Sequence, residues 1–349
     1  MTAETDNKTH LPEGHPPVKK QKVGVLLLNL GTPDATDYWS VRKYLNEFLS
    51  DKRVIDYPSW FWQPLLQGII LTSRPFRSGA AYKSIWNKDK DESPLKTYTR
   101  SQYEKIKAQF ESEYPDVVFE WGMRYGNPST RKGIDSLREQ GCTKILFFAL
   151  YPQYGSPTTA TAYDKAFDIL KKVNWQPAIR TAPPWHDDPG YINVLANAIS
   201  KHLESLDYTP EVIMTSFHGL PKRYLVKKGD PYHCHCQKTS RLVRERLGWP
   251  EEKWITTFQS RFGPEEWLQP YTDETIEKIA KDGVKSMAIV SPAFVSECIE
   301  TLEEIAMEGE EIFHEHGGEK YSYIPCLNDA DEHINLLSGY IRNELAGWI

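Results

Sequence analysis

The sequence is poor in cysteine and has no long apolar run. Its 349 residues include five cysteines at scattered positions, Cys142, Cys234, Cys236, Cys298 and Cys326. This odd and dispersed set does not form a disulfide framework, so we expect a reducing, cytoplasmic compartment. No apolar run approaches the roughly 20 residues that a membrane-spanning helix needs. Residues 1–21 also lack the apolar stretch of a signal peptide and are expected to form a disordered tail.

An excess of positive charge and the glycine motifs of nucleotide-binding sites are absent as well. The net charge of −6 argues against a nucleic-acid-binding protein, which would normally be basic. No G-x-G-x-x-G or G-x-x-x-x-G-K-[ST] motif follows a predicted strand, which argues against a dinucleotide site or a P-loop.

What is present is the composition of an ordinary globular protein, with 40% hydrophobic and 26% charged residues. The 11 Trp and 19 Tyr residues belong either to an aromatic core or to a pocket for a large flat ligand.

Predicted strands and helices alternate along the chain. Apolar runs of strand length, typical of parallel strands buried on both faces, lie at 23–30, 117–120, 145–150, 212–217, 254–258, 287–290 and 321–324. Helical patterns between them include 38–49, 97–114, 163–173 and 190–206. This alternation predicts an α/β fold with doubly wound, Rossmann-like parallel sheets.

The chain length favours two domains, because a single core rarely grows beyond about 250–300 residues. We place the first domain at residues 22–180 and the second at 181–330, with the change near Pro183 and Pro184. Residues 331–349 contain a last helical pattern, at 335–345, which is expected to pack back on the first domain.

His218 stands where a predicted strand ends, directly before Gly219-Leu220-Pro221. Ligands of open α/β sheets bind at the carboxyl ends of the strands. An imidazole in that place can accept a proton or bind a metal ion. The alternative is an ordinary structural hydrogen-bond partner.

A carboxylate-rich helix is predicted after Phe294. It carries Glu297, Glu300, Glu304, Glu308 and Glu311, which fall within one arc of about 80° on a regular α-helix. They form either the solvated face of a surface helix or a ladder that passes a divalent cation inward. Steps of four residues drift by about 40° on an α-helix, so a ladder predicts a widened, π-type turn between about 297 and 311.

Residues 232–236 read Tyr-His-Cys-His-Cys and resemble a metal-binding cluster. If this segment is extended, its histidines point to one side and its cysteines to the other. It therefore does not close a tetrahedral metal site alone.

Residues 59–71 form the most apolar window of the chain, and Arg74, Arg77 and Lys83 follow it. The window is too short, and too interrupted by Pro64 and Gly68, to span a membrane. It is either a buried helix or an interfacial contact with anionic lipid.

An ordered set of short motifs resembles the ferrochelatase family, whose members insert ferrous iron into a porphyrin. The resemblance runs from about Lys22 to Asn328. It is carried by 25–33 (VLLLNLGTP), 93–95 (SPL), 122–125 (GMRY), 151–154 (YPQY), 216–221 (SFHGLP), 229–232 (GDPY), 258–264 (FQSRFGP), 267–268 (WL), 272–274 (TDE) and 296–304 (SECIETLEE). Any one of these motifs is weak, but the set in this order is highly specific.

The resemblance implies two similar half-domains with a porphyrin cleft between them. His218 matches the family's active-site histidine and Glu300 its acidic partner on the opposing wall. Glu304 and Cys298 are further candidates for contact with the metal. The candidates for substrate binding are Leu30, Arg124 and Tyr125 in the pocket, Ser93, and Trp267 at the pocket mouth. Residues 59–77 match a mobile lip that admits the porphyrin and can touch the membrane.

The resemblance implies no resident prosthetic group, and ferrous iron is a substrate. Some family members hold a [2Fe–2S] cluster with cysteines after the catalytic domain, but this chain ends at Ile349 without such a tail. The family position that supplies the remaining cluster ligand resembles Ser156. A cluster is therefore not expected. Where some members have a histidine two residues before the glutamate, this chain has Cys298.

The implied reaction inserts ferrous iron into protoporphyrin IX, forms protohaem and releases two protons, as the terminal step of haem biosynthesis. His218 would accept pyrrole protons, Glu300 would pass them on or position the metal, and basic residues at the rim would orient the propionates. Coproporphyrin or another tetrapyrrole stays open as the substrate, and so does a non-catalytic, two-lobed haem or metal carrier. We expect peripheral contact with the inner face of the cytoplasmic membrane.

Overall fold

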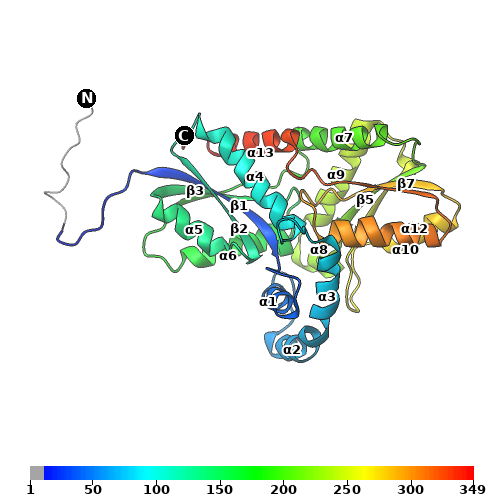
Figure 1. Cartoon of the computed structure of the whole chain (residues 1–349), viewed down its shortest axis with the longest axis horizontal. Helices are drawn as coiled ribbons and strands as arrows, with labels where there is room; N and C mark the ends of the chain where they lie inside the picture. The colour runs from blue at the N-terminus through cyan, green and yellow to red at the C-terminus, as the bar shows by residue number, and fades with distance from the viewer. Residues whose placement is uncertain (1–11) are drawn as a thin grey trace.

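The apolar runs form two four-stranded sheets, one in each half of the molecule (Figure 1). The computed structural model describes residues 12–349. The first sheet has the order β2-β1-β3-β4 and consists of β1 (Lys22–Thr32), β2 (Val117–Gly126), β3 (Cys142–Ala149) and β4 (Ala178–Thr181). The second has the order β6-β5-β7-β8 and consists of β5 (Val212–His218), β6 (Trp254–Gln259), β7 (Ser286–Val290) and β8 (Lys320–Ile324).

All pairs of neighbouring strands are parallel, and the second sheet repeats the strand order of the first. The predicted α/β fold with two similar doubly wound halves is therefore confirmed. Because parallel strands end at the same edge of a sheet, side chains that are far apart in the sequence meet there. His218, for example, lies opposite Gln259 in the register of β5 and β6.

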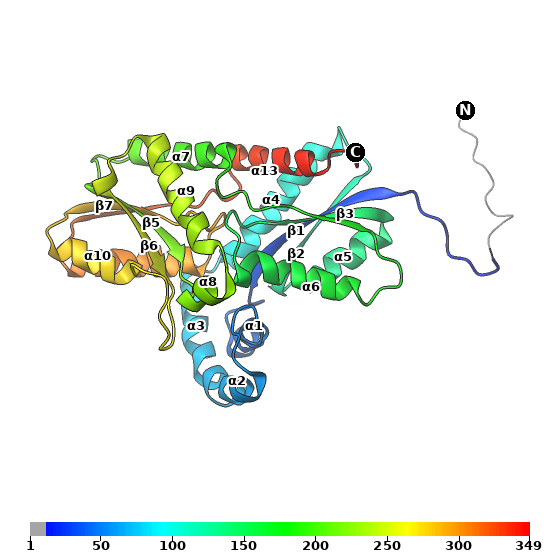
Figure 2. The same ribbon diagram turned by 180° about the vertical axis from the view of Figure 1, so that it is seen from behind.

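Helices connect the strands and cover both faces of each sheet (Figures 1 and 2). Those of the first half are α1 (Tyr38–Leu49), α2 (Ser59–Leu65), the π-helix η2 (Leu66–Ile70), α3 (Leu71–Ile85), α4 (Pro94–Glu111), α5 (Thr130–Glu139), the π-helix η3 (Ser156–Ala160) and α6 (Thr161–Leu170). Those that follow are α7 (Pro189–Glu204), α8 (Lys222–Lys228), α9 (Tyr232–Leu247), the 3₁₀ helix η4 (Glu251–Lys253), α10 (Thr272–Lys281), α11 (Ile299–Thr301), the π-helix η5 (Leu302–Glu308), α12 (Gly309–Glu315) and α13 (Asp331–Glu344).

The central strand β1 is buried on both faces. Leu27 packs in a cluster with Ile106 of α4, whereas its neighbour Leu26 packs with Ile134 of α5. Successive side chains of a strand point to opposite faces, so a strand covered on both sides needs a continuous apolar run. This is the physical reason for the run at 23–30.

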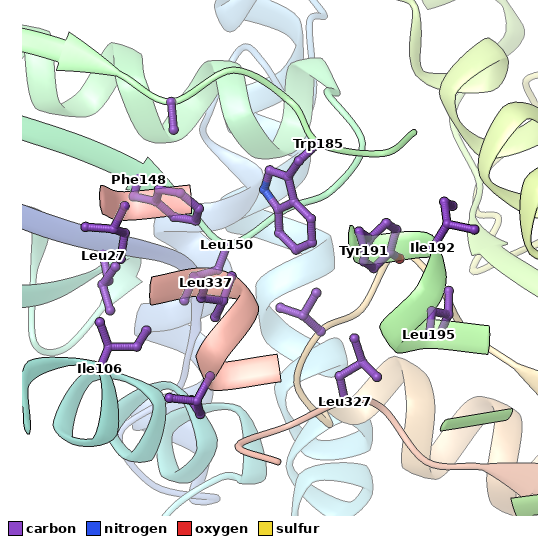
Figure 3. Close-up of a cluster of buried hydrophobic side chains, with 14 of the residues drawn as sticks. Leu27, Ile106, Phe148, Leu150, Trp185, Tyr191, Ile192, Leu195, Leu327 and Leu337 are labelled. Atoms are coloured by element: carbon purple, nitrogen blue, oxygen red, sulfur yellow. The ribbon is translucent and has the colours of Figure 1, made fainter. Parts of the chain in front are cut away.

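One apolar cluster continues from the first half into the second (Figure 3). Leu27 and Phe148 of the first sheet, Leu337 of α13 and Leu195 of α7 belong to it. The last helix, α13, therefore packs against the first half, where Arg342 also lies over the ring of Phe110 at 4.8 Å. A shared core of this kind fixes the two sheets relative to each other.

Several elements differ from the sequence-based expectation. Residues 232–236 are not extended but form the first turn of the 16-residue helix α9, which ends at a left-handed C-cap at Gly248. The strand β4 was not expected, since it is only four residues long and mostly half-exposed. Residues 12–21 are exposed and form no helix or strand, and the rest of the expected tail lies outside the described residues. Within residues 12–349, none of the helices combines the length and the apolarity needed to cross a bilayer.

Candidate active site

A cleft of about 770 Å³ lies between the two halves. The first half contributes the end of β1 and the helices α1 and α3. The second half contributes the ends of β5 and β6 and the segment from Ala293 to Glu308. Its apolar lining includes Leu30, Phe48, Leu49, Val54, Ile85, Leu95, Leu150, Leu220, Phe262, Trp267, Phe294, Val295 and Ile299. Such a lining suits a large apolar ligand, and a few polar groups set its orientation.

His218 lines this cleft from the carboxyl end of β5. Its Nδ1 lies 2.7 Å from the carbonyl oxygen of Gly219. Because a carbonyl only accepts hydrogen bonds, Nδ1 carries the hydrogen of the neutral ring. The lone pair of Nε2 is then free to accept a proton. The predicted place of His218, at a strand end in a cleft, is what the structure shows.

The loop after His218 is held against the loop that follows β6. Gly219 donates its N–H to the carbonyl oxygen of Gln259 at 2.7 Å. A Cβ atom at Gly219 would come within 2.9 Å of that oxygen and 3.1 Å of the Trp267 ring. Only glycine permits this approach, so Gly219 brings His218 and Trp267 into the same wall of the cleft.

The carboxylates Glu300, Glu304 and Glu308 all line the cleft. They lie on a helix that is π-helical from Leu302 to Glu308, so the predicted widened turn is confirmed. A regular, fully solvated α-helix away from any pocket, which was the alternative, is excluded for these three residues. Glu308 and Glu311 also line an adjoining open groove between α3 and α12, so the row of carboxylates leads outward.

Glu304 is the most constrained member of this row. It accepts hydrogen bonds from the backbone N–H of Ser260 at 2.6 Å, from the Ser260 hydroxyl and from Gln259 Nε2 at 3.3 Å. Gln259 also donates to the carbonyl oxygen of Glu300 at 2.7 Å. Burial raises the pKa of Glu304 to about 7, the bonds from Ser260 oppose this rise, and the charge of Glu300 adds to it. Glu304 can therefore exchange a proton near neutral pH.

Glu297 does not belong to the row, and its expected place on the helix is wrong. The helix begins at Ile299, and Glu297 precedes it with only 4% of its surface exposed. Its carboxylate accepts hydrogen bonds from the Tyr323 hydroxyl at 2.8 Å and from the Cys326 N–H at 2.9 Å. It thus serves as an internal hydrogen-bond acceptor behind the cleft.

The substrate-binding candidates divide into two groups. Leu30, Ser93 and Trp267 line the cleft. Arg124 and Tyr125 do not, which corrects the expectation that they form part of its wall.

Tyr125 is fully buried, and its hydroxyl donates to Asp51 at 2.8 Å. Arg124 pairs with the same carboxylate, and its Nε donates to the Thr161 hydroxyl at 2.6 Å. Both side chains are thus engaged by Asp51, and Arg124 lines a separate cavity of about 570 Å³.

The four candidates for metal contact line one cleft but do not form a ready-made metal site. In residues 12–349, no group of three or more His, Cys, Asp or Glu side chains is arranged to hold a metal ion. Glu304 is tied to Ser260, and burial raises the pKa of the Cys298 thiol well above its usual value, with the charge of Glu300 adding to the effect. A protonated thiol is a poor metal ligand. His218, Glu300, Glu304 and Cys298 therefore stay separate candidates for contact with the metal.

Three cationic side chains of the cleft were not expected from the sequence. Arg74 and Arg77 on α3 and Arg261 after β6 line it. Arg74 and Arg77 follow an apolar window, which predicted either a buried helix or a contact with lipid. Arg261 stands inside the motif FQSRFGP, which was the available signal. These guanidinium groups suit the recognition of carboxylates.

The lip comprises α2, η2 and α3 and is partly buried, partly exposed. Trp62 is 6% exposed and its Nε1 donates to the carbonyl oxygen of Leu49 at 2.7 Å, so it belongs to the core. Trp60 and Phe76, by contrast, are 80% and 68% exposed. The buried-helix interpretation is thus confirmed for Trp62, whereas contact of the exposed side chains with lipid stays a prediction.

The histidines and cysteines of 232–236 do not meet as ligands. Cys234 is exposed and Cys236 buried on the same helix. His235 stacks on the ring of His186 at 3.6 Å, and its Nδ1 accepts the N–H of Tyr154 at 3.2 Å. His233 stacks on Phe258. The segment packs α9 onto its surroundings.

The chain is similar to known proteins over nearly its whole length. The family model described as Ferrochelatase matches residues 22–345. The chain is 60% identical over 340 residues to a ferrochelatase of Allorhizobium ampelinum, covering 97% of this chain and 98% of the relative. It is 59% identical over 339 residues to a ferrochelatase of Agrobacterium fabrum, with 97% and 98% coverage. The solved structure of SirB from Bacillus subtilis with Fe3+ has a TM-score of 0.57 at 14% identity, covers 93% of this chain and 96% of its own, and shares the fold.

Proposed function

The chain belongs to the ferrochelatase family, and on that premise we propose how its cleft carries out the reaction. The enzyme is a lyase that inserts ferrous iron into protoporphyrin IX, forms protohaem and releases two protons, in haem biosynthesis. The observation that carries the assignment to this cleft is that His218 and the row of carboxylates that starts at Glu300 line the same largely apolar cavity.

His218 accepts the pyrrole protons. Its Nδ1 is hydrogen-bonded to the carbonyl oxygen of Gly219, so Nε2 is the nitrogen whose lone pair accepts the proton. A porphyrin must bend before its nitrogen lone pairs become accessible to a metal ion. The large apolar surface of the cleft supplies binding energy that can stabilise the bent form.

Glu300 is the first residue of the row of carboxylates in the cleft. It either accepts the protons from His218 or positions the iron. Glu304 and Glu308 continue this row toward the outer groove. Oxygen ligands on successive turns bind a hydrated divalent ion weakly enough to pass it on. Iron and porphyrin would therefore enter along different routes.

The propionates of the porphyrin are assigned to the cationic side chains of the cleft, Arg74, Arg77 and Arg261, with Ser93 as a neutral donor. Arg261 belongs to the second half, where it also pairs with Asp273 and Glu274. Arg74 and Arg77 belong to α3 of the first half. Guanidinium groups bind carboxylates through two parallel N–H···O bonds.

An anaerobic assay with the purified enzyme tests the substrate. We expect ferrous iron to enter protoporphyrin IX with a higher kcat/KM than coproporphyrin, whose additional propionates would have to enter the apolar part of the cleft. The opposite order would assign the enzyme to coproporphyrin. Tight binding of haem without any insertion would favour a carrier.

We propose that the lip makes peripheral contact with the inner face of the cytoplasmic membrane. Its exposed apolar side chains are Trp60, Phe61, Ile69 and Phe76, and the exposed Lys83 follows them on α3. Apolar side chains next to cations suit a surface rich in anionic lipid. A poorly soluble porphyrin could then pass from the membrane to the cleft.

Co-sedimentation with vesicles that contain phosphatidylglycerol tests this contact. We expect Trp60→Ala/Phe76→Ala to bind at least about threefold more weakly than the wild type, since each replacement by alanine removes apolar area from the interface with the membrane. Wild-type binding should weaken as salt is added. Trp175→Ala is the matched control, because Trp175 is 51% exposed but lies outside the lip. Equal binding of the double variant and the wild type would remove the lip from the membrane.

We propose that the enzyme works without an iron–sulfur cluster. The support is chemical: a serine, Ser156, stands where cluster-bearing members have a ligand, and Cys142, Cys236 and Cys298 are buried in different elements. Protein purified without oxygen should contain no stoichiometric acid-labile sulfide and show no charge-transfer bands. Sulfide in stoichiometric amount would contradict this and direct attention to Cys234 and Cys236.

A further inference from the structure

Arg223 lies outside the lining of the cleft but contacts two segments that shape it. It stands on α8, five residues after His218. Its two Nη groups bind both carboxylate oxygens of Asp56, and its Nε donates to Glu265 at 2.8 Å. Asp56 lies two residues before Pro58, the N-cap of the lip helix α2, and Glu265 lies two residues before Trp267. One guanidinium thus joins the base of the lip, the loop of His218 and the loop of Trp267.

The ion pairs are largely withdrawn from water. The side chains of Arg223 and Asp56 are 25% and 16% exposed, and that of Glu265 is 31% exposed. Lys228, also on α8, binds Asp56 as well. Burial alone would raise the pKa of Asp56, but the hydrogen bonds from Arg223 and Lys228 hold it at about 2. The pair is therefore fully ionised at any pH at which the enzyme works.

Two further hydrogen bonds align the same three segments. The Tyr224 hydroxyl donates to the carbonyl oxygen of Val54 at 3.0 Å. Leu268 donates its N–H to the carbonyl oxygen of Leu220 at 2.9 Å. In Figures 1 and 2 the loop after β6 descends beside α3, which agrees with Arg74 lying over the Phe262 ring at 5.6 Å. The lip consequently touches the second half at its base and along α3.

We propose that Arg223 is a positioning residue for metal insertion, which keeps the lip in register with the loops that carry His218 and Trp267. This inference rests on the proposed function of the cleft. Arg223 has no contact with the cleft interior, so its effect would pass through the two loops. A displacement of about 1 Å in a reacting group can lower a rate by up to about 10²-fold. The planar guanidinium of Arg223 binds Asp56 with two bonds and Glu265 with its Nε. A lysine ammonium cannot reproduce this geometry.

Arg223→Met and Arg223→Lys, assayed beside Lys222→Met, test the proposal. We expect both Arg223 variants to lower kcat about tenfold and to raise the KM for porphyrin, while the KM for ferrous iron stays unchanged, because the carboxylate row has no contact with Arg223. Lys222 is the matched control: it is the adjacent residue and pairs with Glu266 of the same loop at 2.8 Å, but has no ion pair with the lip. Lys222→Met should stay within about twofold of the wild type.

A second comparison separates positioning from folding. Arg223→Met/Asp56→Asn should lower kcat by little more than Arg223→Met alone, because both changes remove the same ion pair. Multiplied losses would overturn the proposal, and so would an unchanged kcat and porphyrin KM in a folded Arg223→Met enzyme. Titration of porphyrin by quenching of tryptophan fluorescence needs no turnover. If the wild type inserted no iron, the proposed function would fail, whereas unaltered porphyrin affinity of Arg223→Met would count against Arg223 alone.

Discussion

Replacing His218 by alanine is expected to lower the rate of iron insertion by about 10²- to 10⁴-fold, the usual effect of removing a general acid–base group. The structure supplies the reason. The neutral ring donates from Nδ1 to Gly219, which leaves Nε2 as the acceptor at the end of β5. Porphyrin affinity should change little, since the cleft lining is largely apolar and most of the contact area remains.

His218→Asn distinguishes the loss of the base from the loss of the local hydrogen bond. An asparagine amide can still donate toward the Gly219 carbonyl, but it offers no lone pair of comparable basicity. We therefore expect His218→Asn to be as inactive as His218→Ala. His202→Ala is the control, because His202 is also half-buried and hydrogen-bonded, to Ser322 at 2.7 Å, but lies outside the cleft. Near-normal turnover in a folded His218→Asn enzyme would assign proton acceptance to another group.

The parts of the fold and site that the sequence predicts share one property: each follows from a local pattern. The continuous apolar run of β1 reflects burial on both faces, and the helix 38–49 coincides with α1 because its apolar period is regular. The widened turn around Glu304 was predicted from the four-residue spacing of carboxylates alone. The strand end next to Gly219 makes His218 a candidate, since ligands bind at that edge of a parallel sheet, and the resemblance to the family singles it out.

The errors concern side-chain partners that lie far away in the sequence. Arg124 and Tyr125 sit near the end of a strand, as expected, but Asp51 occupies both, and no local pattern announces that contact. Glu297 has the helical spacing of Glu300, yet the Tyr323 hydroxyl and the Cys326 N–H hold it inside the protein. The spacing in the sequence predicts the helix or strand on which a residue lies, whereas tertiary packing determines which partners its charged group contacts.

Arg223 is a residue whose proposed role could not be predicted from the sequence, again because its partners lie far away in the chain. In the sequence it is one of several basic residues after Pro221, and nothing distinguishes it from Lys222. Only the fold brings Asp56 and Glu265 to it from segments about 170 and 40 residues away. A residue that acts by joining distant segments carries no signal in a single sequence.

Replacing Glu304 by glutamine is expected to raise the KM for ferrous iron by about 10- to 100-fold. That range corresponds to the roughly 1.5–3 kcal/mol that an interaction with a charged group contributes. Glutamine keeps the size of the side chain and can still accept the N–H of Ser260, so the fold should be retained. The KM for porphyrin should stay within about twofold, because the apolar lining is untouched.

The pH dependence of that effect is the sharper test. Burial raises the pKa of Glu304 to about 7, so the carboxyl is mostly neutral below pH 7 and mostly ionised above it. Only the ionised form attracts Fe²⁺, so the wild-type KM for iron should fall as the pH rises through about 7. In Glu304→Gln the group is neutral at every pH, and the ratio of variant to wild-type KM should approach one near pH 6 and reach its maximum near pH 8. A ratio that is constant across this range would show that Glu304 does not carry the iron by its charge. In that case the row of carboxylates would not be the path of the metal, which would enter by another route.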